Sequence, residues 1–343
     1  MILAGGVGSR FWPVSTPARP KQVLPLAGEL PLVRQTVERV LPLVPAERIR
    51  ILTGAHLGPA IIAATPALTA SSLLLEPQAR GTAPVLAWAA HTLLQADPRA
   101  VMVSLHADHV IAPETAFREL LETAAAASLE HGRLFTIGAR PTRAETGYGY
   151  IRPGAPLAEG STAHVVDRFV EKPDVATAER YIAEGYLWNT GLFIWPAALL
   201  LEELRRHTPE LASLLPLLDR GDVEGFFERA PNLTIDVGLL ERTDRVAVVP
   251  ASFDWDDVGA WDAVARTRAA DAAGNVLAGE AYAVDATGNI AWSEDGAIAL
   301  FGVHDLVVVH AHGVTLVAAR ERAPQLKQLL ERLPDRLVRL EGS

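Results

Sequence analysis

The chain has 343 residues, 49% apolar and 21% charged, which suits a folded protein of one large or two ordinary domains. Its net charge of −10 argues against a nucleic-acid partner, because binding a phosphate backbone requires a dense basic face. No apolar run could span a bilayer, and glycines and an arginine interrupt the first ten residues, unlike a signal peptide. The absence of cysteine excludes disulfides and thiolate zinc sites. We therefore expect a cytoplasmic protein without a membrane or nucleic-acid partner.

Strands and helices alternate along most of the sequence. Short apolar runs predict strands at residues 2–4, 49–53, 101–105 and 134–138. Helices are predicted at 32–43, 82–96 and 115–130, the second with Thr82 as its N-cap and a proline in its first turn. This alternation is typical of a doubly wound α/β fold, in which helices cover both faces of a mostly parallel sheet. The first strand is either very short or lacks native residues before Met1, since central strands usually have about 5–6 residues.

The pattern changes after about residue 265. Short alternating runs with turn signals at 287–289 and 294–296 occupy residues 275–318, which predicts an all-β module such as a partial β-helix. A last helix is expected at 324–333. We therefore divide the chain into an α/β domain, residues 1–264, and a smaller C-terminal β module, residues 265–343, whose surface would suit a homodimer.

The opening segment LAGGVGSRFWPVSTPARPKQ, residues 3–22, is rich in glycine and proline. Glycines after a strand let main-chain N–H groups approach a ligand closely, an arrangement that binds phosphate. The segment lacks the Gly-Lys-Ser/Thr of a Walker loop, and Phe11 stands where a dinucleotide-binding fingerprint needs its third glycine. The loop therefore predicts a phosphate site of another type.

Lysine is rare in this chain. Only three of the 31 basic residues are lysine: Lys21, Lys172 and Lys327. Arginine and lysine replace one another on most surfaces, but not where a compact point charge on a thin stem is required. Each lysine is therefore a candidate for a site that arginine cannot fill.

Eight segments, in order along nearly the whole chain, resemble the sugar-phosphate nucleotidylyltransferases, and most closely the monofunctional mannose-1-phosphate guanylyltransferase branch. They are GGVGSRFWP with PKQ (5–22), EPQARGTAPVLAWAA (76–90), HADH (106–109, PADH in the family), ETGYGYI (145–151), FVEKP (169–173), WNTGLF (188–193), TID (234–236) and DWDDVGAW (254–261). One position departs from the pattern, because the branch usually has arginine where this chain has Thr16, although Arg19 lies nearby.

The resemblance implies a Rossmann-like catalytic domain and a reaction. A phosphate oxygen of mannose 1-phosphate would attack the α-phosphorus of GTP, giving GDP-mannose and pyrophosphate without a covalent intermediate. Such an enzyme must hold attacker and leaving group in line and neutralise their charge. Another base or sugar, or a non-catalytic relative that senses a nucleotide sugar, remains an alternative. Longer relatives add a cupin-type isomerase domain, and the short stretch after the β module leads us to expect no phosphomannose isomerase activity.

The resemblance also implies roles for individual residues. Lys21 would lie near the α- and leaving phosphates and Arg10 at the β/γ end. The expected nucleotide-binding residues are Leu3, Ala4, Gly5, Gly6, Gly8, Ser9, Glu76, Arg80, Gly81, Thr82 and Ala83. The expected sugar-phosphate residues are Gly147, Tyr148, Glu171, Lys172, Asn189, Thr190 and Gly191, with Lys172 on the phosphate. Guanine would be read by main-chain groups at 80–83 or by Glu76. For Asp236, the sequence leaves two roles open, a contact with the ligand or structural support of the site.

Asp108 and Asp257 are expected to hold a Mg²⁺ ion that bridges the phosphates. Asp108 follows a buried strand, and ligands of open α/β sheets bind at the carboxyl ends of strands. Two carboxylates suffice, because substrate oxygens and water complete the coordination of Mg²⁺. Asp256 is adjacent and remains an alternative to Asp257. His106 and His109 flank Asp108 in a pattern that zinc could use, but phosphate chemistry favours magnesium.

Overall fold

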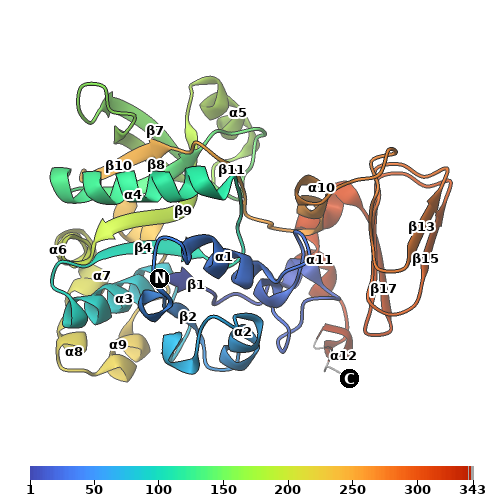
Figure 1. The fold of residues 1–343 in the computed structure, drawn as a ribbon, viewed down its shortest axis with the longest axis horizontal. Coiled ribbons are helices and arrows are strands. Elements are labelled where there is room, and N and C mark those ends of the chain that lie inside the picture. Colours follow the sequence, from blue (N-terminus) through green and yellow to red (C-terminus); the bar gives the residue numbers. More distant parts are fainter. Residues whose placement is uncertain (339, 341–343) are drawn as a thin grey trace.

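A nine-stranded sheet forms the centre of the larger part of the molecule in the computed structural model, which describes residues 1–338 and 340 (Figure 1). The strand order is β3-β2-β1-β4-β9-β6-β10-β8-β7. These strands are β1 (Ile2–Leu3), β2 (Ile51–Gly54), β3 (Leu73–Glu76), β4 (Val101–His106), β6 (Leu134–Ala139), β7 (Gly149–Pro156), β8 (His164–Glu171), β9 (Leu187–Pro196) and β10 (Val246–Pro250). The four strands predicted from apolar runs are all present.

The direction of the strands changes across the sheet. The half that contains β3, β2, β1 and β4 is parallel, as expected. The other half is mixed, because β9 pairs antiparallel with both β4 and β6, and β7 and β8 form an antiparallel pair. The doubly wound α/β class is confirmed, with a mixed sheet. Apolar runs reveal strands but not their direction, and antiparallel neighbours need no helical crossover that a sequence would display.

Helices cover both faces of this sheet. They are α1 (Leu32–Val40), α2 (Gly58–Ala64), α3 (Thr82–Ala96), α4 (Glu114–His131), α5 (Val175–Ala183), α6 (Ala197–His207), α7 (Pro209–Ala212), α8 (Leu215–Asp219) and α9 (Val223–Arg229). Alternate residues of β10 point to opposite faces of the sheet and so enter two different apolar cores. Val246 and Val248 join the core beneath α3 and α6, whereas Ala247 and Val249 join the core beneath α1, α2 and α4. Among the described helices, none combines the length and the apolar composition needed to cross a membrane.

The start of α3 differs from the prediction. The helix begins at Thr82 with Gly81 as its N-cap, so the expected cap at Thr82 is wrong. The Thr82 hydroxyl accepts a hydrogen bond from the Ile235 amide (2.8 Å), and the Ala83 amide donates to the Leu233 carbonyl (3.0 Å). A distant loop thus satisfies groups at the helix start that a local side-chain cap would otherwise serve.

The C-terminal module is a short stack of parallel strands. It contains β12 (Val276–Ala278), β13 (Ala281–Val284), β14 (Ile290–Ser293), β15 (Ile298–Phe301), β16 (Leu306–Ala311) and β17 (Val314–Ala319). β12, β14 and β16 pair in parallel, as do β13 and β15, while β17 closes the stack antiparallel to β16. Buried Asn289 links successive turns, since its amide nitrogen donates to Asn275 and its oxygen accepts from the Leu306 amide. The helix expected at 324–333 is divided between a 3-10 helix (Arg320–Gln325) and α11 (Lys327–Leu330), and α12 (Asp335–Val338) follows.

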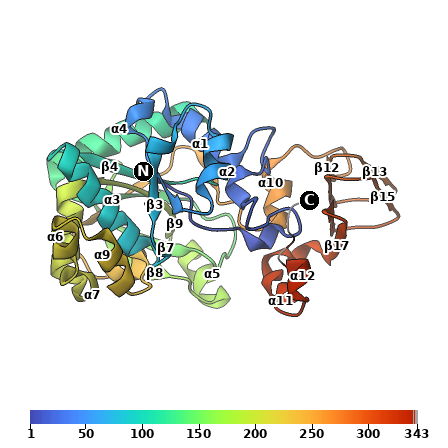
Figure 2. The same ribbon diagram turned by 90° about the horizontal axis from the view of Figure 1, so that it is seen from below.

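The opening loop lies between the sheet and this module. Figures 1 and 2 show the β module at one end of the molecule, with α10 (Val264–Thr267) and the N-terminal loop beside it. A shared apolar core contains Trp12 of the loop together with Trp261 and Trp292. The Trp261 indole donates to the Trp12 carbonyl (3.1 Å), and the Trp12 indole donates to the Leu337 carbonyl (2.8 Å). The C-terminal part of the chain therefore buttresses the glycine-rich loop.

Candidate active site

Lys21 lies at the centre of the site. Its Nζ atom pairs with Oδ2 of Asp108 at 2.7 Å and donates to the main-chain carbonyl of Asp257 at 2.8 Å. The lysine side chain is 8% exposed, so these contacts replace most of its water. The structure thus brings one predicted catalytic residue together with both predicted metal ligands, from three segments far apart in the sequence.

The glycine loop is shaped around this lysine. The Lys21 amide donates to the Val7 carbonyl at 3.0 Å, and the Gln22 side chain donates to the Gly6 carbonyl at 2.6 Å. Gly8 has φ +75°, and a Cβ atom there would lie 2.2 Å from Cβ of Lys21. Glycine at position 8 is therefore required by both the backbone conformation and the space that Lys21 occupies.

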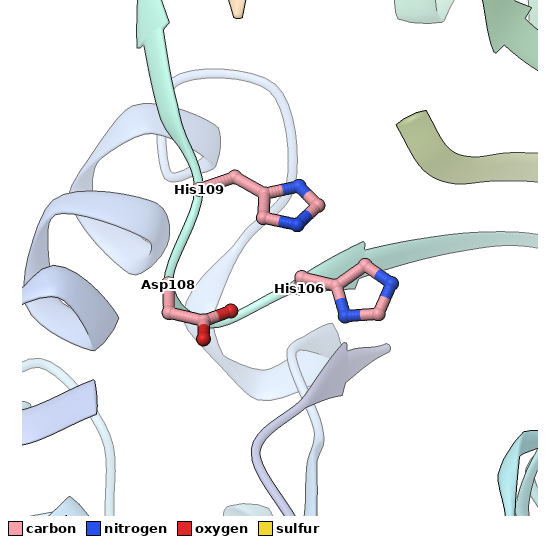
Figure 3. Close-up of side chains that lie close together, drawn as sticks. All are labelled: His106, Asp108 and His109. Carbon is pink, nitrogen blue, oxygen red and sulfur yellow. The ribbon is translucent and has the colours of Figure 1, made fainter. Parts of the chain in front are cut away.

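Asp108 lies in the turn between β4 and β5 (Val110–Ala112), beside two stacked imidazoles. Figure 3 shows its carboxylate turned toward His106, and the rings of His106 and His109 are 4.5 Å apart. Burial opposes ionisation of Asp108 most strongly. The charge of Lys21, followed by the two histidines, nevertheless lowers the pKa of Asp108 to about 2. Asp108 is therefore an anion at neutral pH.

The surroundings of His109 argue against the zinc alternative. Ligand atoms of His106, Asp108 and His109 lie within 4.8 Å of one another, as a metal site would require. However, the Trp255 indole donates to Nδ1 of His109 at 3.1 Å. Burial lowers the pKa of His109 well below its usual value, and a neutral ring that accepts at Nδ1 carries its proton on Nε2. Neither nitrogen of His109 then has a free lone pair for a metal.

Asp256 and Asp257 have different environments. Asp256 belongs to β11 (Asp254–Asp256) and forms an ion pair with Arg266 at 2.6 Å. Oδ1 of Asp257 accepts from the Tyr148 hydroxyl at 2.5 Å instead. Burial raises the pKa of Asp257, and the charge of Lys21 acts against this. One ammonium therefore pairs with the Asp108 carboxylate and lies near the half-buried Asp257 carboxylate, and two such oxygen donors suit a divalent cation.

A cavity of about 420 Å³ lies over the glycine loop. Its lining includes the predicted nucleotide-binding residues Leu3, Gly5, Gly6, Gly8, Glu76, Gly81 and Thr82, together with Arg10, Lys21 and Asp108. Burial raises the pKa of Glu76 to about 7. Three further predicted residues, Ala4, Ser9 and Ala83, are not part of this lining. The Arg80 side chain points elsewhere, because its guanidinium donates to the carbonyls of Phe227 and Glu228 at the end of α9.

A second cavity, of about 210 Å³, adjoins the first. Its lining includes the predicted sugar residues Gly147, Tyr148, Glu171, Asn189, Thr190 and Gly191, together with Asp236 and Asp257. The Asn189 amide donates to Asp236 at 2.8 Å. Burial, followed by the charge of Glu171, raises the pKa of Asp236 to about 7. Lys172 lies outside this lining, because its 58% exposed side chain pairs with Glu171 at the rim.

Comparison with known proteins identifies the family. The nucleotidyl transferase family matches residues 1–274, and the MannoseP isomerase/GMP-like beta-helix domain matches residues 279–333. The chain belongs to the nucleotidyl transferase family. This confirms the resemblance inferred from the eight segments and the β-helix interpretation of the C-terminal module.

Relatives cover almost the whole of this nucleotidyl transferase. The xanthan biosynthesis protein XanB of Xanthomonas campestris pv. campestris is 36% identical over 97% of this chain and 72% of its own length. The mannose-1-phosphate guanylyltransferase of Salmonella muenchen is 37% identical with the same coverage. A crystal structure from Thermus thermophilus, described as a mannose-1-phosphate geranyltransferase, has a TM-score of 0.88 and 35% identity over 96% of this chain and 97% of that one.

Two residues of the nucleotidyl transferase site were given no role in the sequence analysis: Trp255, within the DWDDVGAW segment, and Arg143, outside all eight segments. Trp255 lines the sugar-side cavity and sets the tautomer of His109. The Arg143 guanidinium lies over the rings of Trp188 (5.1 Å) and Tyr148 (5.8 Å) and donates to the Tyr148 hydroxyl. Arg143 precedes the ETGYGYI segment by two residues, and nothing in its sequence context distinguishes it from the chain's other arginines.

Arg19 does not make the triphosphate contact that its position suggested, and Lys172 and Val258 depart from ordinary backbone geometry. The Arg19 guanidinium pairs with Glu294 of the β module at 2.6 Å, so it points away from the cavity that contains Arg10. Lys172 and Val258 both have φ +47°, the left-handed region that non-glycine residues avoid. Such strained residues concentrate at functional sites, where surrounding structure holds them.

Replacing Gly8 tests the packing of Lys21. We expect Gly8→Ala to lower the free energy of unfolding by about 2–4 kcal/mol, because the new methyl group meets Lys21 and the backbone is left-handed. Gly6→Ala is the matched control, since a Cβ atom there has no neighbour within 4 Å and the φ of Gly6 is not positive. Urea unfolding of both variants provides the measurement. Equal stability of the two variants would contradict the close approach.

Proposed function

We propose that this chain transfers GMP from GTP to mannose 1-phosphate and releases pyrophosphate. The observation that carries the proposal is Lys21, held between Asp108 and Asp257 in the cavity that adjoins the sugar-side cavity. The family and the relatives named mannose-1-phosphate guanylyltransferase supply the choice of substrates. GDP-mannose would be the other product.

The chain's own residues would bind and orient the two anions. Lys21 would neutralise charge at the α-phosphate and the leaving pyrophosphate, and Arg10 would hold the β/γ end. Asn189 and Glu171 would hydrogen-bond the sugar hydroxyls. Lys172 would leave its exposed pair with Glu171 for the sugar phosphate, because an exposed ion pair contributes little and is readily exchanged. The phosphate of the sugar then attacks in line, so no nucleophile from the protein is needed.

Mg²⁺ is the proposed cofactor, with Asp108 and Asp257 as its protein ligands. When bound, the ion would offset the negative charge of the phosphates. Asp256 is the weaker candidate, because Arg266 and the Val258 amide already occupy both of its oxygens. Tyr148 holds Asp257 in place through its hydroxyl group.

Glu76 is the proposed reader of guanine. An ionised carboxylate accepts two hydrogen bonds side by side, and the N1–H and amino groups of guanine offer two donors at that spacing. The residue lines the nucleotide-side cavity beside Gly5, where a Cβ atom would lie 3.5 Å from Oε1 of Glu76.

The assembly and location follow as further parts of the proposal. The outer face of β13 and β15 exposes Tyr282, Val284 and Phe301, which supports a homodimer formed through the β module. A cytoplasmic location fits an enzyme that uses a nucleoside triphosphate.

A substrate panel tests the function directly. Pyrophosphate release would be measured for GTP, UTP, ATP and dTTP, each with mannose 1-phosphate and glucose 1-phosphate. We expect GTP with mannose 1-phosphate to give the highest kcat/KM. Faster turnover of UTP with glucose 1-phosphate would overturn the substrate assignment. Lys21→Ala is the inactive control, with turnover reduced by roughly 10²–10³, as for loss of one transition-state donor. Retained turnover in this variant would contradict the role of Lys21.

The pKa of Glu76 predicts a pH dependence. Guanine binds the ionised form, so binding releases the proton that Glu76 carries below pH 7, and affinity rises as pH increases. Between pH 6 and pH 8 the gain in GTP affinity should be roughly tenfold, levelling off above the pKa. Calorimetry of wild type and Glu76→Gln isolates this effect, because both share the titration of the triphosphate. Parallel pH profiles would exclude Glu76 as the reader.

Paired variants separate the two candidate metal ligands. Asp257→Asn should lower turnover by at least about 10²-fold and weaken Mn²⁺ binding in the presence of GTP, measured by electron paramagnetic resonance. Asp256→Asn should keep metal affinity and mainly lower thermal stability, because it breaks the ion pair with Arg266. The reverse pattern would assign the metal to Asp256.

A further inference from the structure

His106 occupies a special place between the two cavities. Three of the described residues line both cavities: Leu3, Thr82 and His106. Leu3 is apolar, and the Thr82 hydroxyl accepts from the Ile235 amide while keeping its own O–H donor. His106 is the one residue of the three with an imidazole ring, and it lies where the two cavities meet.

The main chain of His106 is fixed by the sheet. The residue ends β4 and pairs with Leu3 of β1, and its carbonyl oxygen accepts from the Thr36 hydroxyl of α1 at 3.4 Å. It thus stands at the carboxyl end of a parallel strand, where open α/β sheets bind ligands. A group carried by a strand is also held more precisely than one carried by a loop.

The imidazole of His106 is fixed as well. One face stacks on His109, with 4.5 Å between ring centroids. The Nε2 edge lies against Gly191, where a Cβ atom would be 2.6 Å from that nitrogen. Within residues 1–338 and 340, no protein group forms a hydrogen bond with the ring, although Asp108 and Lys21 are close. A polar ring that is held on two sides and faces a cavity is available to a ligand.

We propose that His106 donates a hydrogen bond to a phosphate oxygen at the junction of the two cavities, next to the bond being formed. This rests on the proposed nucleotidyl transfer, in which the sugar phosphate and the α-phosphate must meet where the nucleotide and sugar cavities join. An imidazole has at least one N–H donor in every protonation state, and phosphate oxygens are strong acceptors. His106 is thus a catalytic residue that replaces the proline of the family's PADH segment. The contact is to phosphate, so it does not depend on the base or the sugar.

Three variants test the hydrogen bond with the nucleotide and sugar 1-phosphate pair that wild type turns over fastest. His106→Leu removes the donor, whereas His106→Asn has a similar shape and retains an N–H group. His106→Pro is a second variant without a donor, and it introduces the residue that the family's PADH segment has at this position. We expect kcat to fall roughly 10- to 100-fold in the Leu and Pro variants, with both KM values changed much less, and to recover in part in the Asn variant.

The outcomes separate this inference from the proposed function. Wild-type turnover in the Leu and Pro variants would overturn the role of His106 and leave nucleotidyl transfer intact. An equal loss in the Leu, Asn and Pro variants, at unchanged melting temperature, would also overturn it, since a packing role alone predicts that pattern. A wild-type protein that turns over no pair would overturn nucleotidyl transfer and this inference together.

Discussion

One buried ammonium group between two aspartates is the interaction on which the site depends. Removing an ammonium and a carboxylate from water costs several kcal/mol per ion, and only short, well-directed contacts offset this. Lys21 has such contacts, at 2.7 Å to Asp108 and 2.8 Å to the Asp257 carbonyl. The Asp257 carboxylate depends on the Tyr148 hydroxyl instead, and its pKa is raised. The site therefore has one ammonium for two carboxylates and carries a net negative charge. This charge favours binding of a dication that arrives with phosphates.

The backbone that holds this lysine is costly, and the rest of the fold supports it. Gly8 adopts the left-handed conformation that only glycine reaches freely, while the non-glycine residues Lys172 and Val258 adopt it with a strain of the order of 1–3 kcal/mol each. The opening loop is fixed on one side by β1 and on the other by the tryptophan-rich core shared with the β module. The C-terminal part of the chain thus has a direct structural role at the site. It hydrogen-bonds Trp12 of the loop twice, through the indole of Trp12 and through its main-chain carbonyl.

The sequence predicted the parts of the molecule that follow from local pattern. Alternating strands and helices identified the α/β class, and the carboxyl ends of strands correctly placed Asp108 next to a cavity. Patterns of apolar residues carry no information about strand direction. The prediction of a mostly parallel sheet therefore missed that β9 pairs antiparallel with β4 and β6. The side-chain direction of Arg80 was missed for a related reason, since it is set by carbonyls at the end of α9, about 150 residues away in the chain. The tautomer of His109 likewise depends on a distant tryptophan.

The scarcity of lysine has a physical explanation at one position but not at the others. The stem of Lys21 runs past Gly8 so closely that a single added carbon would meet three of its atoms, and Nζ directs two short contacts to different partners. Arginine has the same stem carbons, but its broad, planar guanidinium cannot replace the compact ammonium that makes both contacts from one atom. Lys172 is 58% exposed and Lys327 lies on the surface, so packing would tolerate arginine at either place. Any requirement for lysine at position 172 must therefore come from the ligand it meets rather than from the folded chain, whereas the requirement at position 21 is built into the loop itself.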